Sequence, residues 1–468
     1  MRRVTDSVSA PFGDTPCVSD LLSRMRERGA REAFWWQGKS ISYQELDQRI
    51  TAWERRLGNR GIGPGDPLAL LGDYSPESVS LILTLIKVGA VAVPFTAAVT
   101  NELPELARLA GARNLVRFET DDRHSFEALP EAPVPELVAD FRQHRHPGLI
   151  VFTSGSTGKP KGILHDCERL VKKFAMQRTA YRTLLFLLMD HLGGFNTFMG
   201  ALSYGGVLIA PGVRQPEAVA QTIERARVEL LPVTPTFLNL LLAAGSAADH
   251  DMSSVKLISY GTEVMTEATL ERITELFPNA RFQQTYGLSE LGALRSKSQD
   301  SSSTWVKVGG EGFETKIVEG ILHVRSESAM VGYLNAPNPF DAEGWFNTGD
   351  AVEQNGEFVR ILGRRSEMIN VGGQKVFPAE VETALLEAGN VTEATVFGEQ
   401  HPLMGHVVVA RISLSEPEEA LALKARLRKH CLSRLAPFKV PVKFVVTQED
   451  QHNLRFKKAR PTHGGAAT

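Results

Sequence analysis

Between residues 216 and 285 the chain repeats one pattern, in which amphipathic helices alternate with short apolar strands. The predicted elements are a helix after Pro216, a strand at 230–233, a helix around 238–242, a strand at 255–259, a helix around 270–276 and a strand at 281–285. Such an alternation folds into a parallel sheet covered by helices on both faces. Ligands of these sheets bind beyond the carboxyl ends of the strands, so we expect functional residues in the loops that follow them.

The character of the chain changes after Asp350. The predicted elements of this part are a hairpin arm at 356–361, strands at 391–396 and 407–412, a helix from about 417 to 431 and a final strand near 442–446. Together they make a small α+β domain of about 100 residues, a size that can fold independently. We place the boundary in the charged segment 363–367, which gives an N-terminal domain of residues 1–364 and a C-terminal domain of residues 365–468.

Composition excludes several classes of protein. The formal net charge of -2 argues against a broad basic surface for nucleic acid. Three widely spaced cysteines indicate reduced thiols and a cytoplasmic location. The most apolar stretch, residues 81–95, is too short to span a bilayer, so we predict no membrane span. We interpret it as a buried helix at 81–88 followed by a buried strand at 91–93.

The strongest chemical signal lies directly after an apolar strand at 149–152. Residues 153–162 read Thr-Ser-Gly-Ser-Thr-Gly-Lys-Pro-Lys-Gly. Small residues let backbone amides approach an anion closely, the hydroxyls add donors, and Lys159 and Lys161 add positive charge. Gly155 and Gly158 are too close together for a Walker A loop. The segment therefore predicts a polyphosphate-binding loop of another type.

This string resembles the phosphate loop of the adenylate-forming superfamily, which includes acyl- and aryl-CoA synthetases, the adenylation domains of peptide synthetases, and luciferases. Further segments that are similar to motifs of this superfamily, in the same order, are 41–46, 61–66, 284–290, 348–350 and 363–382. The resemblance covers nearly the whole chain. It implies a large N-terminal α/β domain with parallel sheets covered by helices, which binds ATP and the acid. It also implies a small, mobile α+β C-terminal domain that rotates between two half-reactions.

The resemblance assigns a set of residues to ATP. These are Thr153, Ser154, Gly155, Ser156, Thr157, Gly158, Lys159, Lys161, Gly261, Thr262, Glu263, Gln284, Thr285, Tyr286, Gly287, Asp350 and Arg364. Within this set Tyr286 would stack on adenine with its flat face. Asp350 would accept hydrogen bonds from the ribose hydroxyls, with Arg364 in support.

The segment after Tyr286 is expected to carry the metal and the reacting phosphate. Ser289, at a position usually held by Thr, would donate to the α-phosphate. Glu290 and Thr157 would bind Mg²⁺, a hard cation that prefers oxygen ligands and phosphate partners. Thr262 stands where relatives often have a second glycine, which predicts a shorter acid pocket.

The resemblance also assigns residues to the domain rotation and to the thiol. Glu367 stands where the family usually has a hinge Asp. The loop that contains Gly372 and Gly373 is similar to the part that lines the thiol tunnel. Few residues absorb such a rotation, and they usually lie at the ends of elements.

The catalytic lysine lies in the segment that departs most from the family. Relatives carry a Gly-Lys pair with Arg following, whereas this chain reads Phe456-Lys457-Lys458-Ala459-Arg460. The spacing to Arg460 favours Lys457, with Phe456 in place of the glycine. Lys458 is the rival, which we otherwise interpret as a solvated surface charge.

The acid is read from the segment 188–195. His191 is in register with an Asp that amino-acid-activating members use to pair the α-ammonium, which indicates an acid without an α-amino group. A register shifted by one place would make Asp190 that partner, and the amino-acid alternative stays open at this point.

Together these features predict ATP- and Mg²⁺-dependent activation of a small carboxylic acid as its acyl-adenylate, followed by transfer to a thiol. We expect CoA to supply the thiol, in an acyl- or aryl-CoA ligase. The alternatives are an enzyme that loads the phosphopantetheine of a carrier protein acting in trans, and a nucleotide-binding relative without turnover, suggested by Phe456. Intact Glu290, Asp350 and Lys159 argue against the last.

Overall fold

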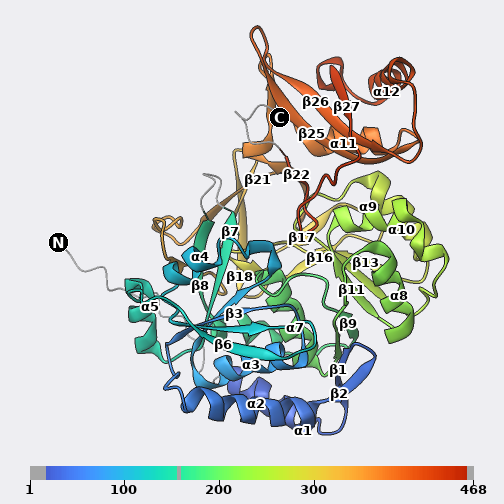
Figure 1. Cartoon of the computed structure of the whole chain (residues 1–468). Helices are drawn as coiled ribbons and strands as arrows, with labels where there is room; N and C mark the ends of the chain where they lie inside the picture. Colours follow the sequence, from blue (N-terminus) through green and yellow to red (C-terminus); the bar gives the residue numbers. More distant parts are fainter. Residues whose placement is uncertain (1–16, 155–159, 461–468) are drawn as a thin grey trace.

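The computed structural model describes residues 17–154 and 160–460. Figure 1 shows a large N-terminal part with a smaller C-terminal domain seated on it. The N-terminal helices are α1 (Cys17–Glu27), α2 (Tyr43–Gly58), α3 (Pro76–Val88), α4 (Leu103–Leu109), α5 (Glu136–Phe141), α6 (Cys167–Val171), α7 (Leu192–Tyr204), α8 (Pro216–Ala226), α9 (Pro235–Ala244) and α10 (Glu267–Leu276). The start of α2 is a capping box, in which Ser42 and Glu45 each accept a backbone amide of the other.

The first sheet of the N-terminal part confirms the alternating pattern. Its strands, in spatial order, are β13 (Arg281–Gln284), β12 (Leu257–Tyr260), β11 (Leu230–Val233), β9 (Arg182–Leu184), β10 (Val207–Ile209), β1 (Glu32–Trp36) and β2 (Lys39–Ser42). All neighbours run parallel except the β1–β2 pair. The carboxyl ends of its strands therefore face the same edge, where the loops that carry the predicted motifs begin.

A second seven-stranded sheet carries the phosphate-loop strand. Its order is β20 (Gly332–Tyr333), β8 (Pro160–Asp166), β7 (Gly148–Ser154), β4 (Val91–Phe95), β3 (Pro67–Leu71), β5 (Asn114–Phe118) and β6 (His124–Ala128). The central strands β7, β4, β3 and β5 are parallel, and β8, β6 and β20 are antiparallel to their neighbours. The predicted helix at 81–88 and strand at 91–93 lie within α3 and β4.

A third sheet, not predicted as a sheet from the sequence, completes the N-terminal part. Its strands are β16 (Ser296–Ser298), β17 (Val306–Val308), β22 (Phe358–Arg364), β21 (Phe346–Asn355), β19 (Ile321–Ser326) and β18 (Phe313–Val318), all antiparallel. A short pair, β14 (Gly287–Leu288) and β15 (Gly292–Ala293), lies beside the predicted adenine and metal motif. The predicted hairpin arm at 356–361 is the β21–β22 turn.

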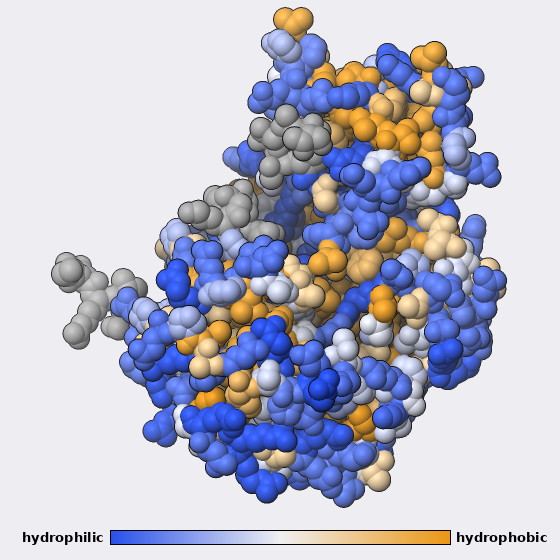
Figure 2. Space-filling model, in the orientation of Figure 1, coloured by the Kyte–Doolittle hydropathy of each residue, from blue (hydrophilic) through white to orange (hydrophobic). Residues whose placement is uncertain are grey.

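The C-terminal domain has its own sheet and core. Its elements are β23 (Ile369–Val371), β24 (Gln374–Val376), α11 (Pro378–Leu386), β25 (Val391–His401), β26 (Gly405–Leu414), α12 (Ala420–Arg434) and β27 (Lys443–Val446). The domain contacts α9 and α10 through β25 and α11. Figure 2 shows apolar side chains gathered on it, and exposed Val442, Val445 and Val446 lie on or beside β27. Sheet membership changes between Arg364 and Ile369, and the domain boundary at 364/365 stays a prediction.

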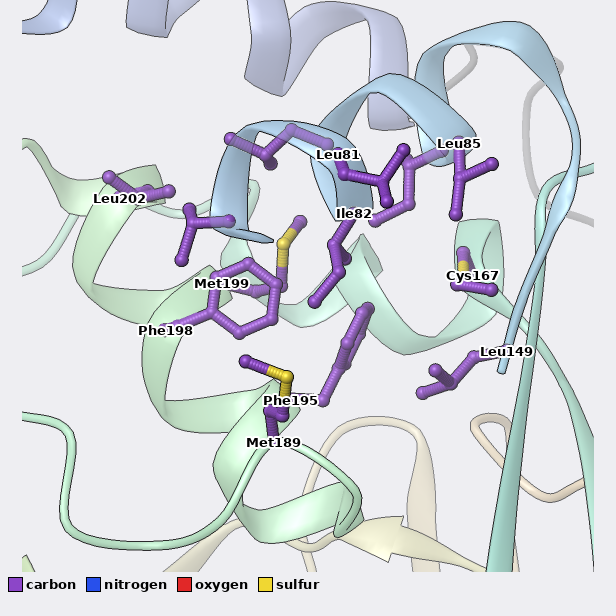
Figure 3. Close-up of a cluster of buried hydrophobic side chains, with 14 of the residues drawn as sticks. Leu81, Ile82, Leu85, Leu149, Cys167, Met189, Phe195, Phe198, Met199 and Leu202 are labelled. Carbon is purple, nitrogen blue, oxygen red and sulfur yellow. The ribbon is translucent and has the colours of Figure 1, made fainter. Parts of the chain in front are cut away.

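The largest core cluster fixes the start of α7. Figure 3 shows side chains of α3, among them Leu81 and Ile82, meeting Phe195 and Phe198 of α7. Each buried side chain of this size contributes about 1.5–3 kcal/mol. The turn before α7 is tight, because a Cβ added at Gly194 would lie 2.0 Å from the carbonyl oxygen of Leu188. Packing and turn together hold the residue just before α7 in a fixed place.

Candidate active site

A cavity of about 920 Å³ lies where the loops after the strands meet the C-terminal domain. The structure brings most predicted residues to its walls. They are Thr153, Lys161, His191, Gly261, Thr262, Glu263, Gln284, Thr285, Tyr286, Gly287, Ser289, Glu290, Asp350, Arg364, Glu367 and Lys457. Ser154 ends strand β7. Gly155, Ser156, Thr157, Gly158 and Lys159 lie outside the described residues.

The ends of β12 and β13 form one wall of the cavity. The amide of Thr285 donates to the carbonyl of Tyr260 at 2.7 Å. The chains run so close that a Cβ added at Gly261 would lie 2.5 Å from the carbonyl oxygen of Thr285. Thr262 follows in the left-handed region with a φ of 70°, a conformation that glycine adopts more easily. Its side chain faces the cavity.

A hydrogen-bonded trio occupies the predicted ribose site. The hydroxyl of Tyr286 donates to Asp350 Oδ2 at 2.5 Å, and Arg364 Nε lies 2.8 Å from Asp350 Oδ1. Arg364 also donates to the carbonyl of Thr348 at 2.6 Å. Burial raises the pKa of Asp350, against the opposing effects of Arg364 and Tyr286. The trio holds the Tyr286 ring at the cavity wall and presents a carboxylate beside it.

Glu290 has a partner that the sequence did not indicate. The hydroxyl of Tyr333 donates to Glu290 Oε1 at 2.7 Å, and Lys161 Nζ lies 5.0 Å from the centre of the Tyr333 ring. Tyr333 is brought there by the pairing of β20 with β8. One tyrosine therefore connects the metal motif to the lysine that follows the phosphate loop.

A buried histidine fixes the backbone of the same motif. His165 Nε2 lies 2.7 Å from the carbonyl oxygen of Ser289. Burial lowers the pKa of His165 to about 4, so the ring is neutral at pH 7 and donates from Nε2. Sequence reasoning missed His165, because it lies in β8 and no local pattern links it to a loop 124 residues away.

Lys457 and Lys458 point to different partners. Lys457 lines the cavity, and within the described chain it makes no ion pair. Burial lowers the pKa of its ammonium, while Glu263 acts in the opposite direction. Lys458 Nζ instead lies 2.7 Å from Glu382 Oε2 and donates to the carbonyl of Ala394 at 2.9 Å. Our interpretation of Lys458 as a solvated surface charge is wrong, because its side chain is 16% exposed and its partner Glu382 only 2%.

Phe456 anchors this segment on the N-terminal part. Its backbone has a φ of 52°, in the region that glycine adopts most easily. Its ring centre lies 5.1 Å from that of Phe186 and 5.7 Å from that of Phe237. Its carbonyl accepts a hydrogen bond from the Thr234 hydroxyl at 2.8 Å. The residue that replaces the family's glycine thus keeps the glycine conformation and adds an aromatic contact.

A buried ion pair adjoins this anchor. Arg455 Nη2 lies 3.1 Å from Asp190 Oδ2, which also accepts from the Thr96 hydroxyl at 2.9 Å. Asp190 is 3% exposed and is absent from the described walls of the cavity, whereas its neighbour His191 lines it. Asp190 Oδ2 is therefore bound to Arg455 and Thr96, while Oδ1 is buried without a hydrogen-bond partner among the described residues, so the alternative in which Asp190 binds an ammonium group stays a prediction.

His191 is placed to meet a substrate. Its Nε2 atom is buried and has no hydrogen-bond partner within the described residues. Burial, together with the nearby charges of Lys457 and Arg455, holds its pKa well below the ordinary value, so the ring is neutral. A neutral imidazole beside a cavity lysine offers a hydrogen bond without a charge.

Glu367, the predicted hinge residue, forms an ion pair with Arg460, the last residue that the structure describes. Arg460 contacts Glu367 Oε2 at 3.0 Å with one nitrogen and Glu382 Oε1 at 2.9 Å with the other. Gly372 and Gly373 form the turn between β23 and β24 and are not among the described wall residues. Their assignment to the thiol tunnel, like the hinge role of Glu367, stays a prediction about the rotated arrangement.

Comparison with known proteins identifies the family. The family model described as "AMP-binding enzyme" matches residues 22–334, and the "AMP-binding enzyme C-terminal domain" matches residues 380–457. Since the first match covers more than half of the chain, the chain belongs to the AMP-binding enzyme family. This confirms the predicted superfamily resemblance and fold class. It makes the protein an AMP-forming acid–thiol ligase, which activates a carboxylic acid with ATP and passes the acyl group to a thiol.

Curated relatives are similar over nearly their full length. The indoleacetate–CoA ligase of Aromatoleum aromaticum is 27% identical, with 88% of this chain and 90% of that protein covered. The 4-chlorobenzoate–CoA ligase of an Arthrobacter species is 26% identical, with 91% of this chain and 90% of that protein covered. The 2-succinylbenzoate–CoA ligase of Bacillus subtilis is 25% identical over 94% and 96%.

Solved structures share the fold. The anthranilate CoA ligase AuaEII in complex with anthranoyl-AMP superposes with a TM-score of 0.79 at 21% identity, covering 93% of this chain and 94% of that one. The o-succinylbenzoate CoA synthetase of Bacillus subtilis, in complex with its acyl-adenylate, superposes with a TM-score of 0.74 at 22% identity, covering 97% of this chain and 98% of that one. No helix in the described ranges is long and apolar enough to cross a membrane.

Proposed function

We propose that this protein is an ATP-dependent ligase that joins an aromatic carboxylic acid to CoA. The observation that carries the proposal is the convergence of Lys457, His191, Glu290 and the Tyr286–Asp350 pair on one cavity. Each of the relatives named above is a CoA ligase named for an acid with an aromatic ring. That agreement supports both the acceptor and the class of acid.

The nucleotide would lie along the wall formed by β12, β13 and the ribose trio. Tyr286 offers its ring face to adenine, while its hydroxyl is held by Asp350. Asp350 Oδ1 already faces Arg364, so a ribose hydroxyl would join an existing network. Preorganised polar groups of this kind bind without further reorganisation.

Mg²⁺ fits the donor set at Glu290. Within the described residues no group of three or more His, Cys, Asp or Glu side chains surrounds a metal site. That agrees with Mg²⁺, which typically takes one or two carboxylates and completes its shell with water and substrate phosphates. When bound, the metal would neutralise charge on the phosphates. Glu290, oriented by Tyr333, would hold it, with Thr157 as the predicted second ligand.

Lys457 would act in the first half-reaction. The acid's carboxylate oxygen attacks the α-phosphorus of ATP, a P–O bond forms, and pyrophosphate leaves. Because burial disfavours the ammonium, its charge gains most when the carboxylate and phosphate arrive beside it. His191, being neutral, would donate a hydrogen bond from Nε2 to the carboxylate without repelling the lysine.

The second half-reaction requires this segment to leave. A thiol attacks the acyl carbon, AMP departs, and a thioester forms. The Arg455–Asp190 ion pair and the Phe456 contacts hold Lys457 in the cavity and must open when the C-terminal domain turns. Glu367, three residues after the end of β22, would absorb the rotation, and Gly372 and Gly373 would then approach the thiol.

The test is a two-stage assay with a panel of acids. Pyrophosphate release with ATP and Mg²⁺ identifies acids that are adenylated, and mass spectrometry with CoA identifies the thioester. Lys457→Met should abolish pyrophosphate release, whereas Lys424→Met, at an exposed position on α12, should not. Adenylate without acyl-CoA, together with loading of a carrier protein, would replace CoA by the phosphopantetheine acceptor. Absence of pyrophosphate release with every acid would refute the proposal.

A further inference from the structure

One end of the cavity carries three basic side chains that the nucleotide does not use. Lys173, Arg178 and Arg295 all line it. The ammonium of Lys173 donates a hydrogen bond to the carbonyl of Ala293 at 2.9 Å. Ala293 belongs to β15, only three residues beyond Glu290. The basic cluster is therefore part of the same cavity as the metal motif.

The neighbouring lysine shows that Lys173 is oriented inward. Lys172 is one residue earlier, in the same short 3-10 helix, and its ammonium lies 3.1 Å from Glu327. Lys173 makes no ion pair within the described ranges. Arg295 pairs at 3.3 Å with Glu311, which is 73% exposed, so this carboxylate lies at the surface.

The acidic side chains on the described walls of the cavity already contact other groups of the protein. Asp350 faces Arg364, Glu290 accepts from Tyr333, and Glu367 and Glu382 face Arg460. Glu263 accepts the backbone amide of Lys458. The end that carries Lys173 thus has positive charge without a matching carboxylate among the described residues that line it.

A charged ammonium at the position of Lys173 is unfavourable unless a negatively charged group lies beside it. Burial, together with the charges of Arg178 and Arg295, lowers the pKa of Lys173 to about 7. Removing a charge from water without a partner costs several kcal/mol, and an opposite charge within about 4–6 Å reverses the effect. The cluster has the properties of a binding site for an anion.

The surrounding side chains fit an aromatic body attached to that anion. The Phe174 and Tyr204 rings meet edge to face with centres 5.8 Å apart, and both line the cavity. Lys173 Nζ lies 5.2 Å from the centre of the Phe174 ring. Asn196 and Thr197 of α7 add hydrogen-bonding groups.

We infer that the acid substrate carries a second carboxylate, which Lys173, Arg178 and Arg295 bind while the reacting carboxylate meets Lys457 and His191. This rests on the proposed function and narrows its substrate to an aromatic dicarboxylic acid. A bidentate guanidinium and a partly desolvated ammonium recognise a carboxylate with charge-assisted hydrogen bonds. A methyl group in its place would leave Lys173 without a carboxylate partner among the described residues.

The experiment compares matched pairs of acids in the pyrophosphate-release assay. Isophthalate is paired with 3-methylbenzoate, and 4-carboxycinnamate with 4-methylcinnamate. Hydrogen bonds to charged groups predict a kcat/KM about 10- to 100-fold higher for the diacid of the preferred pair. Lys173→Met should remove that preference, Lys173→Arg should restore part of it, and Lys172→Met should keep it in full.

Each outcome separates the two proposals. If monoacids are adenylated as well as diacids, and Lys173→Met changes neither, the dicarboxylate inference is wrong and the proposed function stands. If no acid of either kind is adenylated, the proposed function itself fails. Arg295→Met provides a second variant, which should also lower kcat/KM for the diacid more than for its methyl partner. Thermal melting checks that each variant is folded.

Discussion

Replacing Phe456 tests how firmly the catalytic segment is held. Phe456→Ala removes the ring from Phe186 and Phe237 but leaves a side chain in the left-handed region. Phe456→Gly removes the ring and also relieves the backbone. The two variants differ only in strain, so together they separate the aromatic contact from the backbone conformation.

The magnitude follows from these two terms. Burying an aromatic ring is worth about 2 kcal/mol, and a non-glycine residue in the left-handed region costs about 1 kcal/mol. Docking of the segment should therefore weaken by about 2 kcal/mol in Phe456→Ala, roughly 30-fold, and by about 1 kcal/mol in Phe456→Gly, roughly fivefold. Adenylation needs the docked segment, so its rate should fall in that order once the docked fraction becomes limiting.

The assay measures the half-reactions separately. Single-turnover pyrophosphate release reports adenylation, and conversion of a supplied acyl-adenylate to thioester reports the second step. We expect both variants to slow the first step, alanine more than glycine, and neither to slow the second. If glycine slows adenylation more than alanine, or if both variants match the parent protein, the anchoring role is refuted.

Four further predictions concern the same segment and the metal motif. Lys457→Ala should lower adenylation by about 10²–10³ and leave thioester formation from supplied adenylate intact, as stopped-flow assays of each step would show. Lys458→Ala leaves Glu382 with Arg460 alone and should destabilise the C-terminal domain by about 3 kcal/mol in urea melts. Burial tends to raise the pKa of Glu382, but Lys458 and Arg460 outweigh it and hold the pKa below its unfolded value. Its contribution to stability is therefore complete above the unfolded pKa and is lost as pH falls through the folded pKa; Glu382→Gln should flatten that loss of stability in urea melts at pH values below the unfolded pKa. Glu290→Ala should weaken Mg²⁺-dependent activation at least tenfold, seen as a shifted Mg²⁺ titration of pyrophosphate release; an unshifted titration would remove its metal role.

Much of the fold was predictable because its signals are local. The capping box at Ser42 and Glu45, and the helix–strand alternation from 216 to 285, depend on residues a few positions apart. The third sheet was missed for the opposite reason. Strands such as β16 and β17 are three residues long, too short to show a period, and β17 joins the sheet by pairing with β22 about 50 residues away.

The residues of the candidate site also divide into those with a local sequence signal and those without one. Motif strings located the residues around Tyr286 and Asp350, because their chemistry is written in short segments. The partners Tyr333 and His165 could not be found, since each reaches the site through strand pairing in a distant part of the chain. Lys458 was misjudged because a charge run in sequence does not reveal that the carboxylate opposite, Glu382, is buried.

Segment 455–460 contacts both domains: its side chains divide after Lys457, although the backbone amide of Lys458 still donates to Glu263 of the N-terminal part. Arg455, Phe456 and Lys457 face the N-terminal part, while Lys458 and Arg460 are bound to the C-terminal domain. If the C-terminal domain turns between the half-reactions, as we propose, the first set of contacts must break while the second is kept. Tight docking of this segment on the N-terminal part would protect the reactive adenylate from escape and hydrolysis but would delay thioester formation. Loose docking would reverse both effects. The aromatic ring at position 456 adds contacts to the first set and would therefore favour the docked arrangement over the rotated one.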